Sequence, residues 1–367
     1  MKPDQIQIRR LSGSELEAGQ ACIAAFWRPD HVLVRSPAFF RWQFSPPTQA
    51  EGLSFWVAEH EARPVGCCGA LPLDCHYAGE VFPGTGTARF FVRPEYRKHK
   101  VGLRLLYHVY RDKNFYWTLT TTALSRPLAD LLGQHTPEAL PRYACLVCRE
   151  RLAEVLRHSR ETLATIDDYG GTPRLLPAAG LEGGYRMEAL GPDGLDEWDR
   201  AWRTTLAPLM SGVYKNAAWL KWRYLDHPLF DYQIMVVRDK KGELAGLAVT
   251  RTAEICPEAS AVRVLEFFAR ETAAGQALAA GLAERLPDST AYLEHSVFGK
   301  WWEPLSSIGL APMAPPGFSY YFSPPNLAHI QMQPAVGVDL SGWTAEAFMA
   351  NPRIYLSVGD GDVDEPR

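Results

Sequence analysis

The 367-residue sequence lacks any run of about 18 apolar residues, which a membrane-spanning helix would need. It also lacks a strong charge of either sign: 38 basic and 42 acidic residues leave a net charge of −4, which gives no general attraction to nucleic acid or an acidic membrane. Residues 1–10 contain no apolar core, so we expect no signal peptide. These absences predict a cytoplasmic protein without a nucleic-acid or membrane partner.

Cysteine is too sparse and too irregularly spaced to form a disulfide framework. The seven cysteines are an odd number, and a reducing compartment accommodates them most simply. Cys145 and Cys148 have the spacing of a metal or redox motif, but they lie in an apolar run typical of a strand, where residues three apart face opposite sides. No second pair with this spacing completes a zinc site, so we expect buried strand cysteines and no metal.

What the sequence does contain is a pattern that occurs twice. Its composition, 47% hydrophobic and 22% charged, is that of a globular protein, and its length suits about two domains. Three sets of residues recur at an almost constant offset, 180 positions for the first two and 177 for the third. The matched sets are 40–44 with 220–224, Val65-Gly66 with Ala245-Gly246, and Phe90-Phe91 with Phe267-Phe268. We therefore predict a tandem duplication of one α/β unit.

Glycine and proline gather in one stretch, which we interpret as the linker between the copies. The predicted division is a first domain at 1–168, a linker at 169–184, a second domain at 185–336 and a C-terminal extension at 337–367. In the first copy, residue patterns indicate strands at 6–9, 55–59, 65–73 and 85–92, with a helix between the first two.

A basic segment follows the last of these strands. Arg97, Lys98 and Lys100 stand directly before an amphipathic helix that begins at Val101. Cations are unfavourable at a helix N-terminus, because the helix dipole is positive there. They make sense if an anion is held between them and the unpaired first amides of the helix. A solvated basic surface is the alternative, and the spacing alone does not separate the two.

The segment from Val92 to Gly102 resembles the acyl-CoA signature of the GNAT (GCN5-related N-acetyltransferase) superfamily. That signature is Arg or Gln, two residues, Gly, one residue, and Gly or Ala, placed after a strand. Arg97 matches its first position and Gly102 its last, whereas Lys100 stands where the first glycine is expected. The resemblance implies an α/β protein of two tandem GNAT-like domains, each a mixed, mainly antiparallel twisted sheet flanked by helices.

The resemblance also implies where acetyl-CoA or another acyl-CoA binds. In this family the fourth and fifth strands splay apart, and the pantetheine arm enters between them. The implied binding residues are Phe91, Val92, Arg97, Lys98, His99, Lys100, Val101, Gly102, Leu103 and Ser125. Many relatives carry a tyrosine in the next helix that protonates the leaving thiolate. Residues 126–134 contain none, so this role has no candidate.

The second copy has no such basic segment. No Lys or Arg follows Arg270 until Arg285. Glu271 places a negative charge at the start of the helix, where it suits the helix dipole but would repel a pyrophosphate. We therefore predict that only the first copy binds CoA.

Neither copy offers a clear catalytic base. Glu294 and His295 are adjacent in a strand-like run and so face opposite sides. Glu59 and Glu266 are strand glutamates, of the kind that relatives use to deprotonate an amine. For each of these residues, a paired or surface position is the alternative. The alternating aspartates of 360–364 are interpreted as a solvated acidic tail, because no carboxylate follows at the twelfth position of a calcium loop.

The favoured function is transfer of an acyl group, with acetyl preferred, from acyl-CoA to the amine of a small molecule. A Fem-type aminoacyl transferase is one alternative, and the acidic net charge and the CoA-like segment speak against it. A non-catalytic acyl-CoA-binding or scaffold protein is the other, favoured by Lys100 and by the missing tyrosine. The sequence predicts no oligomeric state.

Overall fold

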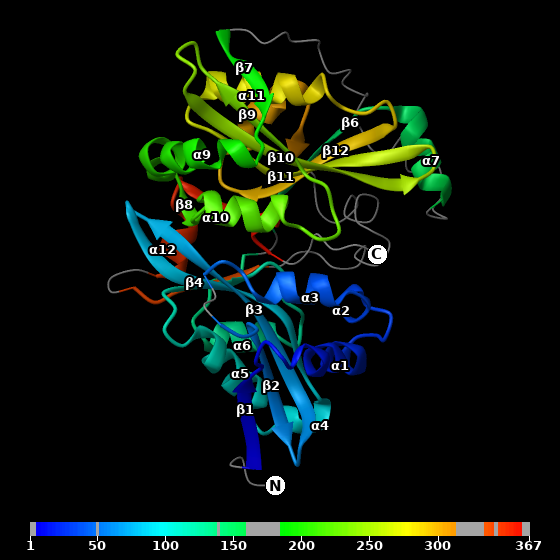
Figure 1. Cartoon of the computed structure of the whole chain (residues 1–367), viewed down its shortest axis with the longest axis vertical. Helices are drawn as coiled ribbons and strands as arrows, with labels where there is room; N and C mark the ends of the chain where they lie inside the picture. The colour runs from blue at the N-terminus through cyan, green and yellow to red at the C-terminus, as the bar shows by residue number, and fades with distance from the viewer. Residues whose placement is uncertain are drawn as a thin grey trace.

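The computed structural model describes residues 5–48, 51–137, 140–158, 184–312, 334–340 and 344–361. Figure 1 shows two halves, with the first, blue to cyan, below the second, green to yellow. Of the predicted linker 169–184, only Gly184 lies within the described residues. Asp362 and Asp364 of the predicted acidic tail also lie outside them.

The first half is built on one mixed sheet. Its strands are β1 (Ile6–Arg10), β2 (Phe55–His60), β3 (Arg63–Tyr77), β4 (Glu80–Val92) and β5 (Phe115–Thr118). Strands that follow one another in this order pair with each other. All of these pairs are antiparallel except β4 with β5, which is parallel. The predicted mixed, mainly antiparallel sheet is thereby confirmed.

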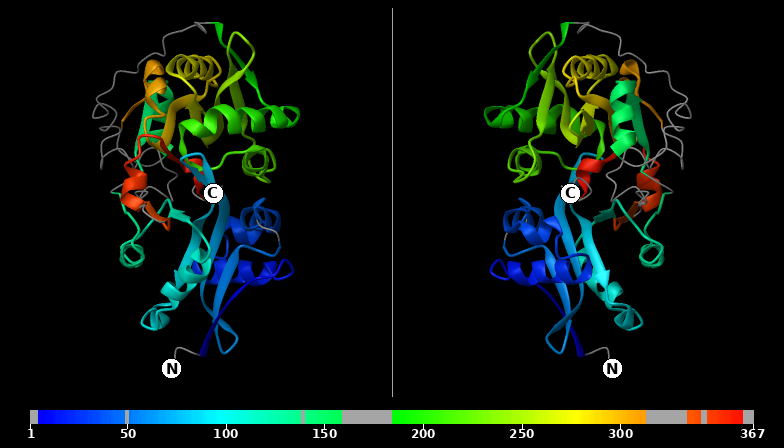
Figure 2. Two further views of the ribbon diagram at one scale, coloured as in Figure 1. Left: turned by 90° about the vertical axis from the view of Figure 1, so that its left-hand side faces the viewer. Right: turned by 90° about the vertical axis from the view of Figure 1, so that its right-hand side faces the viewer.

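Helices cover both faces of this sheet, as the side views in Figure 2 show. They are α1 (Leu16–Phe26), α2 (Val32–Arg35), α3 (Pro37–Phe44), α4 (Pro94–Arg97), α5 (Val101–Tyr110) and α6 (Arg126–Leu131). One apolar cluster joins α1–α3 to one face, and another joins α5 to the opposite face. In α5, Val101, Leu105 and Val109 are all buried, because their four-residue spacing places them on one side of the helix.

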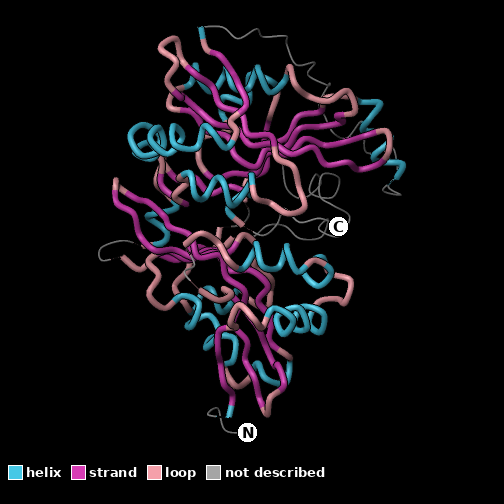
Figure 3. Tube along the Cα trace, in the orientation of Figure 1, coloured by secondary structure: helices cyan, strands magenta, loops and turns pink. Residues whose placement is uncertain are grey.

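The second half repeats this order of elements. It contains β7 (Arg186–Ala189), η3 (Pro192–Gly194), α9 (Leu195–Ala201), η4 (Trp202–Leu206), η5 (Ala207–Leu209), β8 (Ser211–Val213), α10 (Ala217–Leu220), η6 (Lys221–Leu225), β9 (Gln233–Arg238), β10 (Leu244–Cys256), β11 (Ala259–Ala269), α11 (Thr272–Ala283) and β12 (Thr290–Phe298). Here too the sheet is antiparallel until its last pair, β11 with β12, which is parallel. Figure 3 shows strands at the centre of both halves.

Each sheet receives an outer strand that lies beyond the repeated unit. The remaining elements are β6 (Arg142–Leu146), α7 (Arg149–His158), η7 (Glu303–Ile308), β13 (Ala311–Pro312), β14 (Ala335–Val338), α12 (Ala345–Met349), β15 (Ile354–Ser357) and η8 (Val358–Asp360). Strand β6 follows the first unit but pairs with β12 of the second, and β14 follows the second unit but pairs with β5 of the first. The short strands β8 and β15 bridge the two sheets. Chain pairings therefore cross the predicted domain boundary in both directions.

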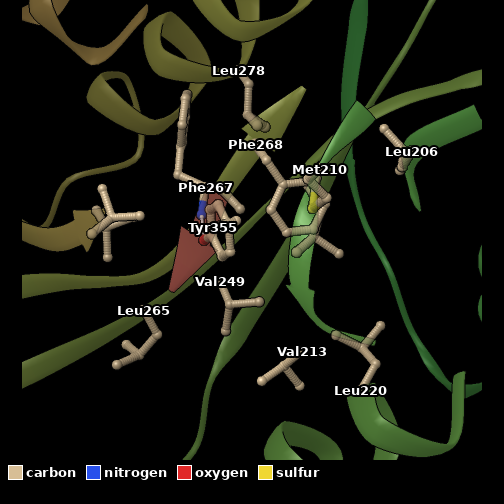
Figure 4. Close-up of a cluster of buried hydrophobic side chains, with 14 of the residues drawn as sticks. Leu206, Met210, Val213, Leu220, Val249, Leu265, Phe267, Phe268, Leu278 and Tyr355 are labelled. Carbon is tan, nitrogen blue, oxygen red and sulfur yellow. Dashed lines mark hydrogen bonds between the residues drawn. The ribbon is translucent and has the colours of Figure 1, made fainter. Parts of the chain in front are cut away.

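The repeat anchors of the two copies meet each other. The Trp42 and Trp222 rings stack with their centroids 5.2 Å apart. Each indole Nε1 donates a hydrogen bond to the other residue's carbonyl oxygen, at 2.7 Å from Trp42 and 3.0 Å from Trp222. The two copies are thus related by an approximate twofold arrangement at this contact. Around it, one hydrophobic core takes side chains from both halves, and Figure 4 shows part of its second-half portion.

Two further sequence predictions concern cysteine and the membrane. Cys145 is buried within β6, while Cys148 lies just beyond the strand and is half-buried. Among the described residues, no three His, Cys, Asp or Glu side chains come together in a way that could hold a metal. None of the described helices has the length and apolar character needed to cross a membrane.

Candidate functional site

The first sheet opens between β4 and β5. The two strands pair at only three positions, Gly84 with Phe115, Thr85 with Tyr116, and Gly86 with Trp117. Strand β4 then continues to Val92, paired with β3 alone in the described part of the chain, while β5 ends at Thr118. The strands therefore form a V whose vertex is at Gly86 and Trp117 and whose open end faces the start of α5.

A β-bulge in β4 lies on one arm of this V. Cys67 is opposite Phe91 and Gly69 is opposite Ala88, so that Arg89 and Phe90 together face a single residue of β3. Arg89 has a φ of 55°, in the left-handed region. Because a bulge leaves an extra residue outside the ladder, it interrupts the regular pairing of β4 with β3 at this point.

The basic segment, residues 93–100, lies at the open end of the V. It consists of α4 and the turn that leads to α5, and the side chains of Lys98 and Lys100 are exposed. Arg97 Nε donates to the carbonyl oxygen of Val92 at 3.1 Å and so ties the segment to the end of β4. The first amides of α5 have no acceptor within the helix and point toward this segment. Backbone donors and basic side chains thus converge, as an anion site requires.

Lys100 supplies the backbone geometry for which the signature uses glycine. Its φ is 59° and its ψ is 23°, a left-handed conformation at the N-cap of α5. A residue with a Cβ adopts this conformation at a cost of about 1 kcal/mol or more. The departure from the signature therefore changes the side chain and adds strain, while the loop keeps the conformation that glycine would allow.

Gly102 brings three elements together. A Cβ at this position would lie 3.0 Å from Cζ of Phe90 and 3.3 Å from Cδ1 of Leu128. Glycine is needed because α5 starts in close contact with both β4 and α6. Ser125 precedes α6, where its Oγ accepts a hydrogen bond from the Thr122 amide at 2.8 Å. The structure therefore gathers the predicted residues of β4, the basic segment, α5 and the start of α6 around the open end of the V.

The corresponding segment of the second half is shorter and carries its own counter-charges. Only Arg270 and Glu271 separate β11 from α11, where the first half has residues 93–100. Arg270 pairs with Asp239 at 2.7 Å and with Glu271 at 3.0 Å. The one cation of this two-residue segment is therefore already paired with carboxylates.

The V of the second half is filled by the protein's own C-terminal segment. Strands β11 and β12 part after Val264 and His295, and β15 then pairs with the end of β12. The hydroxyl of Tyr355 accepts a hydrogen bond from the Phe267 amide at 3.0 Å. By the 177-position offset, Phe267 corresponds to Phe90 in the bulge of β4. Figure 4 shows Tyr355 beside Phe267 and Phe268, so a chain segment occupies the space between the parted strands of the second half.

A buried ionic cluster anchors this segment. Lys215 and Glu266 are 0% exposed and Asp360 is 1% exposed. Lys215 Nζ lies 3.2 Å from Glu266 Oε1 and also contacts the Asp360 carboxylate. The hydroxyls of Tyr224 and Tyr355 donate to Glu266 at 2.8 and 2.7 Å.

The cluster overturns two interpretations of the sequence. Asp360 is not part of a solvated tail, because its charge is paired inside the protein. Glu266 accepts several internal hydrogen bonds and cannot serve as an accessible base. Burial, opposed by Lys215, raises the pKa of Asp360 to about 6. Lys215 was not singled out from the sequence, which holds no local signal for it.

The three other base candidates are held in contacts with other residues of the protein. Both carboxylate oxygens of Glu59 accept hydrogen bonds from Arg9, at 3.0 and 3.1 Å. Glu294 is paired with Arg142 and, at 2.9 Å, with Arg263. His295 is buried and its Nδ1 donates to the Val264 carbonyl oxygen at 2.8 Å, while burial lowers its pKa to about 4.

Comparison with known proteins finds a family model similar to part of the first half. Residues 51–131, which span β2 to α6, match the family model of the acetyltransferase (GNAT) domain. No curated protein is matched by the sequence.

Solved structures share the fold at low sequence identity. A GCN5-related N-acetyltransferase from Anabaena variabilis has a TM-score of 0.58 and 12% identity, with 91% of this chain and 72% of that chain covered. A probable N-acyltransferase from Enterococcus faecalis has a TM-score of 0.59, 8% identity and the same coverage. Saccharomyces cerevisiae N-myristoyltransferase with bound myristoyl-CoA has a TM-score of 0.52 and 11% identity, covering 92% of this chain and 86% of that one. The chain therefore has the fold of these GNAT structures, and its residues 51–131 are similar to the GNAT acetyltransferase domain.

Proposed function

We propose that this protein is an N-acyltransferase that moves an acyl group, acetyl in the first instance, from acyl-CoA to the amine of a small molecule. The observation that carries the proposal is the open V between β4 and β5, which leads directly to the basic segment before α5. The pyrophosphate would lie against Arg97, Lys98, Lys100 and the amides of Val101, Gly102 and Leu103. His99 and Ser125 flank this position, and the backbone of Phe91 and Val92 would pair with the pantetheine amides.

In this scheme the bulge of β4 stabilises the reacting carbonyl. The acceptor amine loses a proton, its nitrogen attacks the thioester carbon, and the negative charge that develops on oxygen is met by a backbone N–H at Arg89 or Phe90. The carbon–sulfur bond then breaks, an amide forms, and the CoA thiolate takes up a proton. Glu59, Glu294 and His295 receive no catalytic role, because other contacts hold them.

A matched pair of variants tests this site. Arg97→Ala removes a cation from the segment before α5 and is expected to weaken acetyl-CoA binding by about 1–3 kcal/mol, which is the usual scale for a hydrogen bond to a charged group. Arg270→Ala removes a cation from the corresponding segment of the second half and should leave the affinity unchanged. Calorimetric titration of both variants gives the comparison. Equal losses, or no binding by the unmodified protein, would contradict the proposal.

A non-catalytic acyl-CoA-binding protein is the second candidate. It is supported by the absence of a tyrosine in α6 and by the occupied state of all the carboxylates considered as bases. Release of free thiol from acetyl-CoA, measured across pools of small-molecule amines, separates the two candidates. Tight binding of acetyl-CoA without release of thiol on any amine would favour the second.

A further inference from the structure

The vertex of the V is closed by one aromatic side chain. Trp117 is the last residue of β5 that pairs with β4, and it is 3% exposed. Its indole lies across β4, since a Cβ at Gly84 or Gly86 would come within 3.2 or 3.1 Å of the ring. Two glycines on β4 therefore make the room that this ring fills.

The indole is fixed in this position. Its Nε1 donates a hydrogen bond to the carbonyl oxygen of Asp360 at 2.9 Å. Asp360 is itself held by the buried pair with Lys215. Leu119 and Gly361 pack together next to it, because a Cβ at Gly361 would lie 2.5 Å from Leu119 Cδ1. Rotation of the ring away from the vertex would break a buried hydrogen bond and displace the C-terminal segment.

The ring also lies on the face of the sheet that a ligand would reach after it passes between β4 and β5. Val92 and Cys68 face α5 and the basic segment, where they share a cluster with Val101. Trp117 and Leu73 belong to the core on the opposite face. A molecule that enters beside α5 and passes through the V emerges on the face of Trp117, with its end directed toward the vertex.

We propose that Trp117 sets the upper limit on the length of the acyl chain that the protein accepts. This inference rests on the proposed function. A chain extended beyond the thioester would meet a rigid, buried ring, and a pocket closed in this way rejects each further methylene by a measurable factor.

The test compares chain-length selectivity within each variant. Acetyl-CoA, butyryl-CoA and hexanoyl-CoA are titrated calorimetrically and assayed by thiol release with Trp117→Ala and the more conservative Trp117→Phe. Trp198→Phe is the matched control. Trp198 lies in the second half and is also buried, and its Nε1 donates a hydrogen bond to the carbonyl oxygen of Lys215 at 2.9 Å, the same distance as the bond from Trp117. Melting temperatures show which variants are folded.

Unmodified protein is expected to favour acetyl-CoA over hexanoyl-CoA by about tenfold or more in kcat/KM. Trp117→Ala should reduce or reverse this ratio, Trp117→Phe should shift it less in the same direction, and Trp198→Phe should keep it. The inference is overturned if the unmodified protein uses hexanoyl-CoA as well as acetyl-CoA, or if a folded Trp117 variant keeps the original ratio. Failure of every acyl-CoA to bind the unmodified protein is a different result, which removes the proposed function itself.

Discussion

The two copies share one fold and differ in what lies between their parted strands. In the first half, the V leads to an exposed basic segment at residues 93–100. In the second, the segment is reduced to Arg270 and Glu271, and β15 occupies the space beside β12. Phe267 corresponds in the second half to the bulge residue Phe90, and its amide donates a hydrogen bond to the Tyr355 hydroxyl. The comparison teaches that two units with the same order of strands can differ in whether the protein's own chain fills the space between the parted strands.

The two halves also differ in whether their charged side chains are exposed or buried. The cations of the first half are on the surface, where a ligand can reach them. The corresponding region of the second half contains a buried lysine with two carboxylates, which hold the C-terminal segment. Charges of the first kind are available for the proposed binding of acyl-CoA, whereas those of the second kind hold the structure together.

The largest effect is expected from separating the halves. Strand β6 completes the second sheet and β14 completes the first, so neither half can pair its outer strand alone. We expect residues 1–158 and 184–367, produced separately, each to fail to fold cooperatively, and co-expression to restore a complex. Circular dichroism and thermal denaturation measure this outcome. Independent, cooperative folding of either fragment would show that the exchanged strands are dispensable.

Removal of Lys215 is expected to have the next largest effect. Lys215→Met leaves two carboxylates buried without their cation and should cost about 3–5 kcal/mol of unfolding free energy. Lys221→Met is the matched control, because Lys221 pairs with Asp226 at the surface, with both side chains about half exposed. That pair should contribute about 1 kcal/mol or less. Denaturant titration of the two variants gives the difference, and similar losses would contradict the structural role assigned to the buried cluster.

A third prediction concerns pH. The pKa of Asp360 is raised from 3.8 to about 6, mainly by burial. Its contribution to stability is therefore fully present below about pH 4 and is lost as the pH rises through about 6. Lys215, Glu266, Tyr224 and Tyr355 are the titratable groups around it.

Asp360→Asn cannot ionise and isolates this contribution. The stability of the unmodified protein relative to the variant should fall by up to about 3 kcal/mol between pH 3 and pH 8, at about 1.4 kcal/mol per pKa unit, and roughly half of this fall should occur above pH 5. The buried His76 and His295, whose pKa values burial lowers to about 4, act in the opposite direction in both proteins and cancel in the difference. If the difference in stability between the two proteins did not change with pH, Asp360 would not carry the raised pKa.

The smallest effect is expected at Lys100. Lys100→Gly relieves a left-handed backbone and should raise stability by about 1 kcal/mol or less, while it loses a charge beside the pyrophosphate. Acetyl-CoA affinity should then fall slightly and depend less on salt. Lys98→Gly is the control, because Lys98 has a right-handed conformation, with φ −61° and ψ −16°, and gains no relief. Clear tightening of acetyl-CoA binding in Lys100→Gly would indicate that the loop is a decayed site.

The sequence by itself determined the elements that depend on neighbouring residues. Ser36 and Asn216 lie 180 positions apart, and each caps a helix by accepting from the amide three residues later. The four-residue spacing in α5 predicted its buried face, and the spacing from Arg97 to Gly102 predicted the segment before it. Such features depend on short-range geometry, which the local sequence encodes.

Tertiary structure alone decided which distant residues meet. Asp360 follows the pattern of a solvated tail in sequence, yet its partner Lys215 lies 145 positions away and removes it from water. The stacking of Trp42 on Trp222, the exchange of β6 and β14 and the filling of the second V likewise join segments far apart in the chain. Burial and ion pairing depend on the whole packed surface around a residue, so its charge pattern in sequence does not reveal them.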